Sequence, residues 1–243
     1  MPLRLAVWSG PRNISTALMR SWGNRADTFV VDEPLYAHYL KVTGLPHPGV
    51  DEIIEHHEAD WQKVAAWLTG PAPQGRAIFY QKHMAHHLLP EIERDWLSNL
   101  THVFLIRDPK EMLTSLIKVL PEPRVEDTGL PQQVELLERV QRETGSTPPV
   151  FDSKDILDAP GPMLRAMCAA VGVPFDDAML NWPRGPRPTD GIWAKHWYAE
   201  VEKSTGFKPF KPKDEPVPNR LNPVYEQCVE LYDVLNAHRV TAS

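Results

Sequence analysis

A basic side chain and two hydroxyl side chains follow the first short apolar run of the sequence. The run covers 3–8, a turn-forming stretch follows at 9–11, and Arg12, Ser15 and Thr16 come next. This pattern predicts a strand, a loop and the start of a helix. Because backbone N–H groups at such a helix start bind anions, the pattern predicts an anion site. The alternative is a capping turn with a surface arginine.

A second basic residue follows the most continuously apolar run, at 102–106. Arg107 comes directly after that run, and Ser115 lies eight residues later in the next predicted helix. A planar guanidinium suits a phosphate dianion, and a serine two turns into the helix can face the same pocket. The alternative is that Arg107 pairs with Asp108 or Glu111 and that the serine is only a small helix residue.

Candidate bases follow two other predicted strands. His83 comes after a strand predicted at 77–80, and Glu33 after one at 29–31. A histidine titrates near neutral pH, and a carboxylate can serve as a base when burial raises its pKa. His83 and His87 also have the spacing of two zinc ligands on one helix face. The other alternative is a surface or core histidine with no role in chemistry.

Short apolar runs alternate with helical patterns along the chain. This order predicts an α/β fold of the P-loop nucleotide-binding type, with three layers and a mostly parallel central sheet flanked by helices. We expect one domain over 1–243, with ligands at the carboxyl ends of the strands. The strands are predicted at 3–8, 29–31, 77–80, 102–106 and 150–152, and the helices at 14–22, 51–68, 88–97, 109–119, 132–143, 162–171 and 223–240.

Composition excludes several classes of protein. Of 243 residues, 42% are hydrophobic and 24% charged, which excludes a disordered chain. The net charge of −6 argues against a nucleic-acid partner. Cys168 and Cys228 are typical of reduced core thiols, so we expect a cytoplasmic protein. Since no apolar run approaches 18 residues, we expect no membrane partner.

The segment 8–18 resembles the loop that binds the 5′-phosphosulfate in sulfotransferases that use 3′-phosphoadenosine 5′-phosphosulfate (PAPS). Ile14 stands where that family usually has glycine, whose missing Cβ leaves the backbone freer. Arg107 and Ser115 have the spacing of the family's 3′-phosphate motif. The loop residues that match the family are Pro11, Arg12, Asn13, Ser15 and Thr16.

Looser similarities extend along the chain. His83 keeps the family's spacing between a catalytic histidine and the Leu-Leu-Pro at 88–90, although the family's lysine two residues earlier is replaced by Gln81. Glu33 with the following proline resembles a Glu-Pro that lies near the acceptor in several branches, and the alternative is a salt-bridged loop carboxylate. The Pro- and Trp-rich segment at about 181–218 resembles the family's lid over the nucleotide, or else its tryptophans dock the segment on the core.

The resemblance implies a sulfotransferase that moves a sulfuryl group from PAPS to a hydroxyl or amine of a small-molecule acceptor and releases 3′,5′-bisphosphoadenosine. It implies no metal. Arg12 would stabilise the leaving phosphate, and His83, ahead of Glu33, would be the base. The cofactor-binding residues would be Arg12, Asn13, Ser15, Thr16, Arg107 and Ser115.

Two other functions remain open from the sequence. The stretch 29–33 resembles a Walker B strand, which favours a P-loop-type nucleotide kinase or NTPase, but the Gly-Lys pair of a Walker A loop is missing. A non-catalytic nucleotide-binding protein would keep the loop and lose the chemistry, and Ile14 is the residue that favours it.

Overall fold

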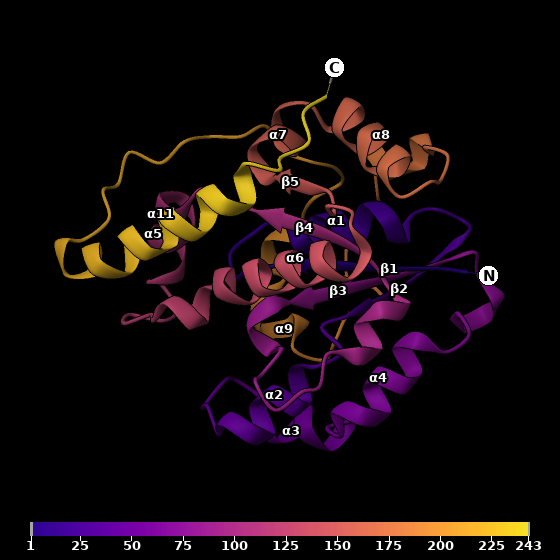
Figure 1. Cartoon of the computed structure of the whole chain (residues 1–243), viewed down its shortest axis with the longest axis horizontal. Helices are drawn as coiled ribbons and strands as arrows, with labels where there is room; N and C mark the ends of the chain where they lie inside the picture. Colours follow the sequence, from indigo (N-terminus) through magenta and orange to yellow (C-terminus); the bar gives the residue numbers. More distant parts are fainter. Residues whose placement is uncertain (1, 243) are drawn as a thin grey trace. The chain divides into compact units, whose positions relative to one another are not determined.

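The computed structural model describes residues 2–242, and its five strands form one parallel sheet flanked by helices (Figure 1). The order of the strands is β2-β3-β1-β4-β5. The α/β prediction is therefore confirmed. The bounds of the strands are β1 (Leu3–Ser9), β2 (Thr28–Asp32), β3 (Ile78–Met84), β4 (Thr101–Ile106) and β5 (Val150–Asp152).

The described residues form two compact units. Unit 1 consists of 2–7, 15–101 and 176–207, and unit 2 of 8–14, 102–175 and 208–242. The single domain expected from the sequence stays a prediction. The α-helices of unit 1 are α1 (Ser15–Gly23), α2 (Tyr36–Thr43), α3 (Val50–His56), α4 (Trp61–Thr69), α9 (Ala194–Trp197) and α10 (Ala199–Glu202). Those of unit 2 are α5 (Pro109–Leu116), α6 (Leu130–Thr144), α7 (Ser153–Asp158), α8 (Pro160–Ala170) and α11 (Asn222–Asn236).

In unit 1, helices cover both faces of the parallel pair β2–β3. Successive side chains of a strand point to opposite faces. Tyr80 of β3 stacks on Trp22 of α1, with ring centroids 5.6 Å apart. Its neighbour Phe79 packs edge-on against Trp67 of α4, at 5.2 Å. Helix α1 therefore covers the even-numbered side chains of β3, and α4 covers the odd-numbered ones.

In unit 2, β4 and β5 run parallel, and Ile106 lies opposite Asp152 at their carboxyl ends. Helix α11 packs on α5 and α6, and Figure 1 shows α11 alongside α6. The Tyr232 hydroxyl of α11 donates to Asp152 Oδ2 over 2.7 Å. Cys168 and Cys228 are buried and are not joined in a disulfide, as predicted.

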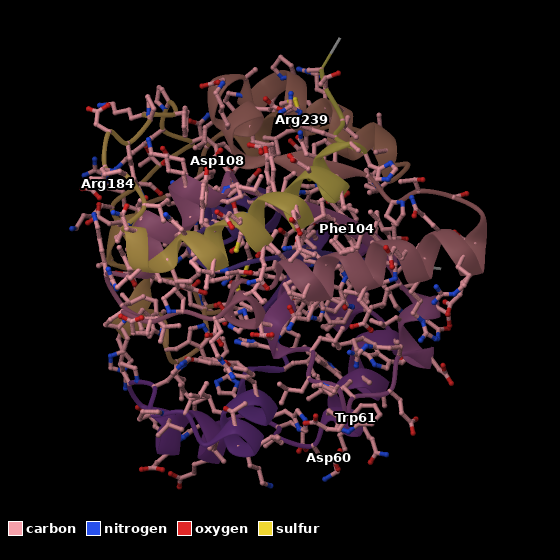
Figure 2. All side chains as sticks on the ribbon, turned by 60° about the vertical axis from the view of Figure 1, so that its left-hand side comes forward. Asp60, Trp61, Phe104, Asp108, Arg184 and Arg239 are labelled. Atoms are coloured by element: carbon pink, nitrogen blue, oxygen red, sulfur yellow. The ribbon has the colours of Figure 1, made fainter. Side chains whose placement is uncertain are left out.

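The helix predicted over 51–68 is wrong. The structure has two helices, α3 and α4, with a break between them. The Asp60 side chain accepts hydrogen bonds from the backbone N–H groups of Gln62 and Lys63, so it caps a new helix start (Figure 2). Helix α2, which follows Pro34, was not predicted from the sequence.

The helix predicted over 88–97 is also wrong. Short 3₁₀ helices at Ala85–His87 and Asp95–Asn99 flank a loop instead. Pro90 has no N–H to donate, and the Arg94 guanidinium donates to the carbonyls of Leu89 and Ile92. The other 3₁₀ helices are Pro73–Gly75, Val125–Thr128, Asp177–Leu180 and Asn219–Leu221. None of the helices in the described part of the chain is long and apolar enough to cross a membrane.

Candidate active site

The loop after β1 is held by its own asparagine. Asn13 Oδ1 accepts from the backbone N–H of Ile14 over 2.8 Å, and Asn13 Nδ2 donates to the carbonyl of Leu105 in β4 over 2.9 Å. The left-handed backbone conformation of this loop falls on Arg12, with φ of 57°, and not on Ile14. The loop therefore does not need a glycine at position 14 for its backbone conformation. Ser15 and Thr16 begin α1, where the sequence places the helix start.

Gly10 does need to be a glycine, because the loop passes very close to another backbone segment. A Cβ at Gly10 would lie 2.2 Å from the carbonyl oxygen of Thr128, closer than any side-chain carbon can approach. Gly10, Asn13 and Thr128 all line a pocket of unit 2, together with Arg107 and Gln133. The path of the loop therefore shapes this pocket.

We expect Gly10→Ala to weaken binding of bisphosphoadenosine by about tenfold or more, because forced overpacking costs about 1–3 kcal/mol and would displace the loop. Isothermal titration calorimetry of both proteins measures this. Gly172→Ala, in the same unit, is the control for backbone strain without a clash, because its φ of 74° strains any side chain but nothing lies within 4 Å of the Cβ it would add. Equal affinity in the Gly10→Ala variant and the wild type would contradict the prediction.

The predicted phosphate-binding residues of unit 2 are in direct contact. Arg12 Nε donates to Ser115 Oγ over 2.9 Å, and an Arg107 guanidinium N–H donates to the backbone carbonyl of Arg12. Burial and the nearby Arg107 lower the pKa of Arg12 from its ordinary value. Two guanidinium groups held this closely repel each other, so an anion between them would stabilise the arrangement.

The alternative reading of Arg107 is correct in part. Its guanidinium also lies 3.3 Å from the Glu111 carboxylate, one helical turn along α5. Asp108 has a different role, because it caps α5 by accepting from the backbone N–H of Glu111 over 3.0 Å. Ser115 is more than a small helix residue, since its hydroxyl binds Arg12.

Sequence reasoning missed a third cation in this cluster. The backbone N–H of Lys213 donates to Glu111 Oε1, and Lys213 Nζ donates to the Glu111 carbonyl and, over 3.2 Å, to Thr114 Oγ1. Burial and Arg107 lower the pKa of Lys213. Lys213 lies 98 residues after Ser115 in a proline- and lysine-rich stretch, so neither spacing nor a motif could identify it.

A buried lysine of β3 contacts two carboxylates at the end of β2 in unit 1. Lys82 Nζ lies 2.8 Å from Asp32 Oδ1 and 2.6 Å from Glu33 Oε1. Glu33 has φ of 41°, an uncommon backbone conformation for a residue with a side chain. Burial raises the pKa of Glu33, and this effect is larger than the opposite effect of the nearby Lys82 ammonium group. This carboxylate can therefore take up a proton more readily than an exposed one.

His83 does not follow a strand end, contrary to the prediction. Strand β3 continues to Met84, and His83 is 1% exposed within it. Its Nε2 lies 3.3 Å from Gln81 Oε1, and Gln81 binds the Leu68 carbonyl of α4. His83 therefore lies on the α4 face of β3. Lys82, which contacts Glu33, lies on the opposite face.

The zinc alternative fails on geometry, because His83 belongs to β3 and His87 to a separate 3₁₀ turn. Among residues 2–242 no group of three or more histidine, cysteine or acidic side chains could hold a metal ion. His87 instead stacks against both Tyr36 and Tyr39, with ring centroids 4.8 and 4.6 Å away. Burial lowers the pKa of His87 well below its ordinary value, and neighbouring histidines lower it further.

We expect this histidine to make the protein less stable in mild acid. The unfolded chain takes up a proton near pH 6.5, whereas folded His87 does so only at lower pH. Stability should therefore fall by up to about 1.4 kcal/mol per pH unit as the pH drops below 6.5. Urea unfolding between pH 7 and 5 measures the slope. His87→Phe keeps the stacking and should flatten it, so an unchanged slope in this variant would contradict the prediction.

The part of the Pro- and Trp-rich segment in unit 1 is docked on the core. Trp193 is 2% exposed and packs edge-on against Tyr36, with centroids 5.1 Å apart. A Cβ at Gly191 would lie 2.1 Å from the Trp193 ring. The Trp182 indole donates to Ser204 Oγ over 3.0 Å. These contacts favour the docking interpretation of the tryptophans, and the role of the segment as a lid stays a prediction.

Comparisons with known proteins agree on the fold. The sulfotransferase domain from the curacin biosynthetic pathway aligns with a TM-score of 0.55 at 14% identity, over 96% of this chain and 98% of that one. The sulfotransferase domain of the Synechococcus PCC 7002 olefin synthase aligns with a TM-score of 0.60 at 19% identity, over 96% of this chain and 94% of that one. A sulfotransferase from Alicyclobacillus acidocaldarius aligns with a TM-score of 0.53 at 13% identity, over 99% of this chain and 97% of that one.

Two curated relatives are similar in sequence. They are the branched-chain-amino-acid aminotransferase-like proteins 2 and 1 of Arabidopsis thaliana, 35% identical over 232 residues and 36% over 231. The matches cover 96% and 95% of this chain, which spans 41% of the length of each relative. The family model described as "Sulfotransferase domain" matches residues 3–238, which is nearly the whole chain. The chain therefore belongs to the sulfotransferase domain family.

Proposed function

We propose that this chain transfers a sulfuryl group from PAPS to a hydroxyl or amine of a small molecule and releases 3′,5′-bisphosphoadenosine. The observation that carries the proposal is the contact of Arg12 with Ser115 and Arg107 beside a pocket of unit 2. Membership of the sulfotransferase domain family supports it. A doubly phosphorylated nucleotide supplies the anion that such a cluster of cations would bind.

The donor would be bound by two sets of groups. Arg107 and Ser115 would hold the 3′-phosphate, because their spacing is that of the family's motif and Arg12 joins them. Arg12 with Asn13, and the Ser15 and Thr16 donors at the start of α1, would bind the 5′-phosphosulfate. These groups would stabilise the charge that develops on the leaving phosphate.

The reaction needs a base and, by this proposal, no metal. The acceptor oxygen or nitrogen forms a bond to sulfur while the bond from sulfur to the 5′-phosphate oxygen breaks, and bisphosphoadenosine leaves with that electron pair. The acceptor's proton goes to a base. A sulfuryl group carries less negative charge than a phosphoryl group, so cationic side chains suffice. Of the two candidate bases, we propose Glu33 rather than His83, because its carboxylate is at a strand end and partly exposed.

Calorimetric titration with bisphosphoadenosine, AMP and ATP, in buffer containing EDTA, tests the proposal. Charge-assisted hydrogen bonds to the 3′-phosphate are worth about 1.5–3 kcal/mol, so bisphosphoadenosine should bind about tenfold or more tightly than AMP. Equal binding of AMP and bisphosphoadenosine would overturn the proposal. Tight binding of ATP only after Mg²⁺ is added would favour the nucleotide kinase or NTPase.

A further inference from the structure

A buried network surrounds the candidate base Glu33. Lys82 is 1% exposed and donates all three of its N–H groups, to Asp32, to Glu33 and to the hydroxyl of Tyr198 over 2.7 Å. The Tyr198 hydroxyl in turn donates to Asp32 Oδ2 over 2.6 Å. The backbone N–H of Gly191 donates to the same oxygen over 3.2 Å. The end of β2, the interior of β3 and the segment 181–207 thus meet in one set of hydrogen bonds within unit 1.

The charges of this network favour the uptake of one proton. One ammonium group faces two carboxylates, so the network carries a net charge of −1 when all three are ionised. Burying an unbalanced charge is costly. Burial alone would lower the pKa of Lys82. The carboxylates of Asp32 and Glu33 outweigh burial and raise this pKa well above its ordinary value. The lysine therefore stays charged, and a carboxylate takes the proton.

Glu33 is the carboxylate that can accept it. Both oxygens of Asp32 are already occupied, because Oδ1 accepts a hydrogen bond from Lys82 and Oδ2 accepts from Tyr198 and Gly191. Among the described residues Glu33 receives one side-chain hydrogen bond, from Lys82. The Glu33 side chain is 13% exposed, compared with 2% for that of Asp32. Of the two carboxylates, that of Glu33 is therefore the more accessible to a bound molecule.

The backbone of Glu33 is held in place as well. Its N–H donates to the Lys82 carbonyl over 2.9 Å, and its own carbonyl accepts from the N–H of Tyr36 over 3.0 Å. An uncommon φ persists only where the surroundings impose it, and such residues cluster at functional sites. Lys82 thus fixes Glu33 through both the backbone and the side chain.

We propose that Lys82 and Tyr198 are positioning residues that hold the Glu33 carboxylate as the proton acceptor, and that the segment 181–207 controls its proton affinity through Tyr198 and Gly191. This inference rests on the proposed function. In the step concerned, the proton leaves the acceptor's oxygen or nitrogen for a Glu33 oxygen as the bond to sulfur forms. Lys82 keeps its three protons throughout.

The titration of Glu33 in the ligand-free protein tests the network. Glutamate carboxyl carbons are labelled with ¹³C, and Glu33→Gln identifies the signal of Glu33 in NMR spectra recorded against pH. Its midpoint should lie above the ordinary value of about 4.3. Lys82→Met removes the opposing charge and should raise the midpoint by about one pH unit or more, whereas Lys82→Arg should not.

Two further variants keep the test decisive if Lys82→Met fails to fold. Tyr198→Phe removes one hydrogen bond from Asp32 and should raise the Glu33 midpoint by a smaller amount. Lys203→Met is the matched control, because this exposed lysine pairs with Glu200 on the surface of the same segment. An unchanged Glu33 midpoint in Tyr198→Phe and in any folded Lys82→Met protein would overturn the inference.

Turnover of PAPS with a panel of simple alcohols, phenols and amines gives the second readout. The acidic limb of the pH profile should move with the Glu33 midpoint in each variant, which a merely structural role would not produce. The titration needs no nucleotide, so the two proposals can fail separately. Shifted Glu33 midpoints in a protein that binds no nucleotide would contradict only the proposed function. Nucleotide binding, together with an acidic limb of the pH profile that stays fixed in the variants, would contradict only this inference.

Discussion

Replacing Glu33 by glutamine should lower turnover of PAPS by about 10²–10⁴-fold, because the acceptor's proton then has no base to receive it. Glutamine has nearly the same shape and can still accept a hydrogen bond from Lys82. The affinity for bisphosphoadenosine should stay unchanged, since the product has no acceptor proton to lose. Release of bisphosphoadenosine from PAPS in the presence of the acceptor panel measures turnover, and calorimetry measures affinity.

His83→Gln is the control for this prediction. The His83 ring is buried on the α4 face of β3, opposite to the face on which Lys82 contacts Glu33, so we expect a smaller effect on turnover. The unfolding free energy of both variants shows whether a loss of activity comes from a loss of structure. If His83→Gln abolishes turnover while Glu33→Gln retains it, the base is His83, and the role of Glu33 must be withdrawn.

Replacing Arg107 by alanine should remove the preference for bisphosphoadenosine over AMP. The variant loses charge-assisted hydrogen bonds worth about 1.5–3 kcal/mol, which corresponds to about 10- to 150-fold in affinity. AMP has no 3′-phosphate, so its weaker binding should change little. Arg107→Lys should recover only part of the preference, because one ammonium group cannot replace a planar fork that also binds the Arg12 carbonyl.

Arg142→Ala is the matched control for Arg107→Ala. Arg142 is an exposed arginine in the last turn of α6, in the same unit. Its removal changes the net charge of the protein equally, so any general electrostatic effect appears in both variants. A preference for bisphosphoadenosine that survives Arg107→Ala would exclude Arg107 from the 3′-phosphate site. Equal losses in the two variants would point to net charge as the cause.

The amino-acid sequence by itself determined the features that depend on neighbours in the chain. The continuous apolar run at 102–106 predicted β4 to within one residue, since burial on both faces favours apolar residues along a strand, and the short strand predicted at 150–152 coincides with β5. The loop of Arg12 and the pair Arg107 and Ser115 were recognised because each motif occupies only a few residues on a strand–loop–helix unit. The fold class followed from the alternation of such units.

The tertiary structure decided which polar residues are buried. Gln81, Lys82 and His83 look like the polar end of a short strand, yet all three lie inside β3. Each can be buried because distant groups provide its hydrogen bonds or packing, such as the Leu68 carbonyl for Gln81 and the Tyr198 hydroxyl for Lys82. Local sequence carries no information on partners so far along the chain. For the same reason the network around Glu33 became visible only once the chain was folded.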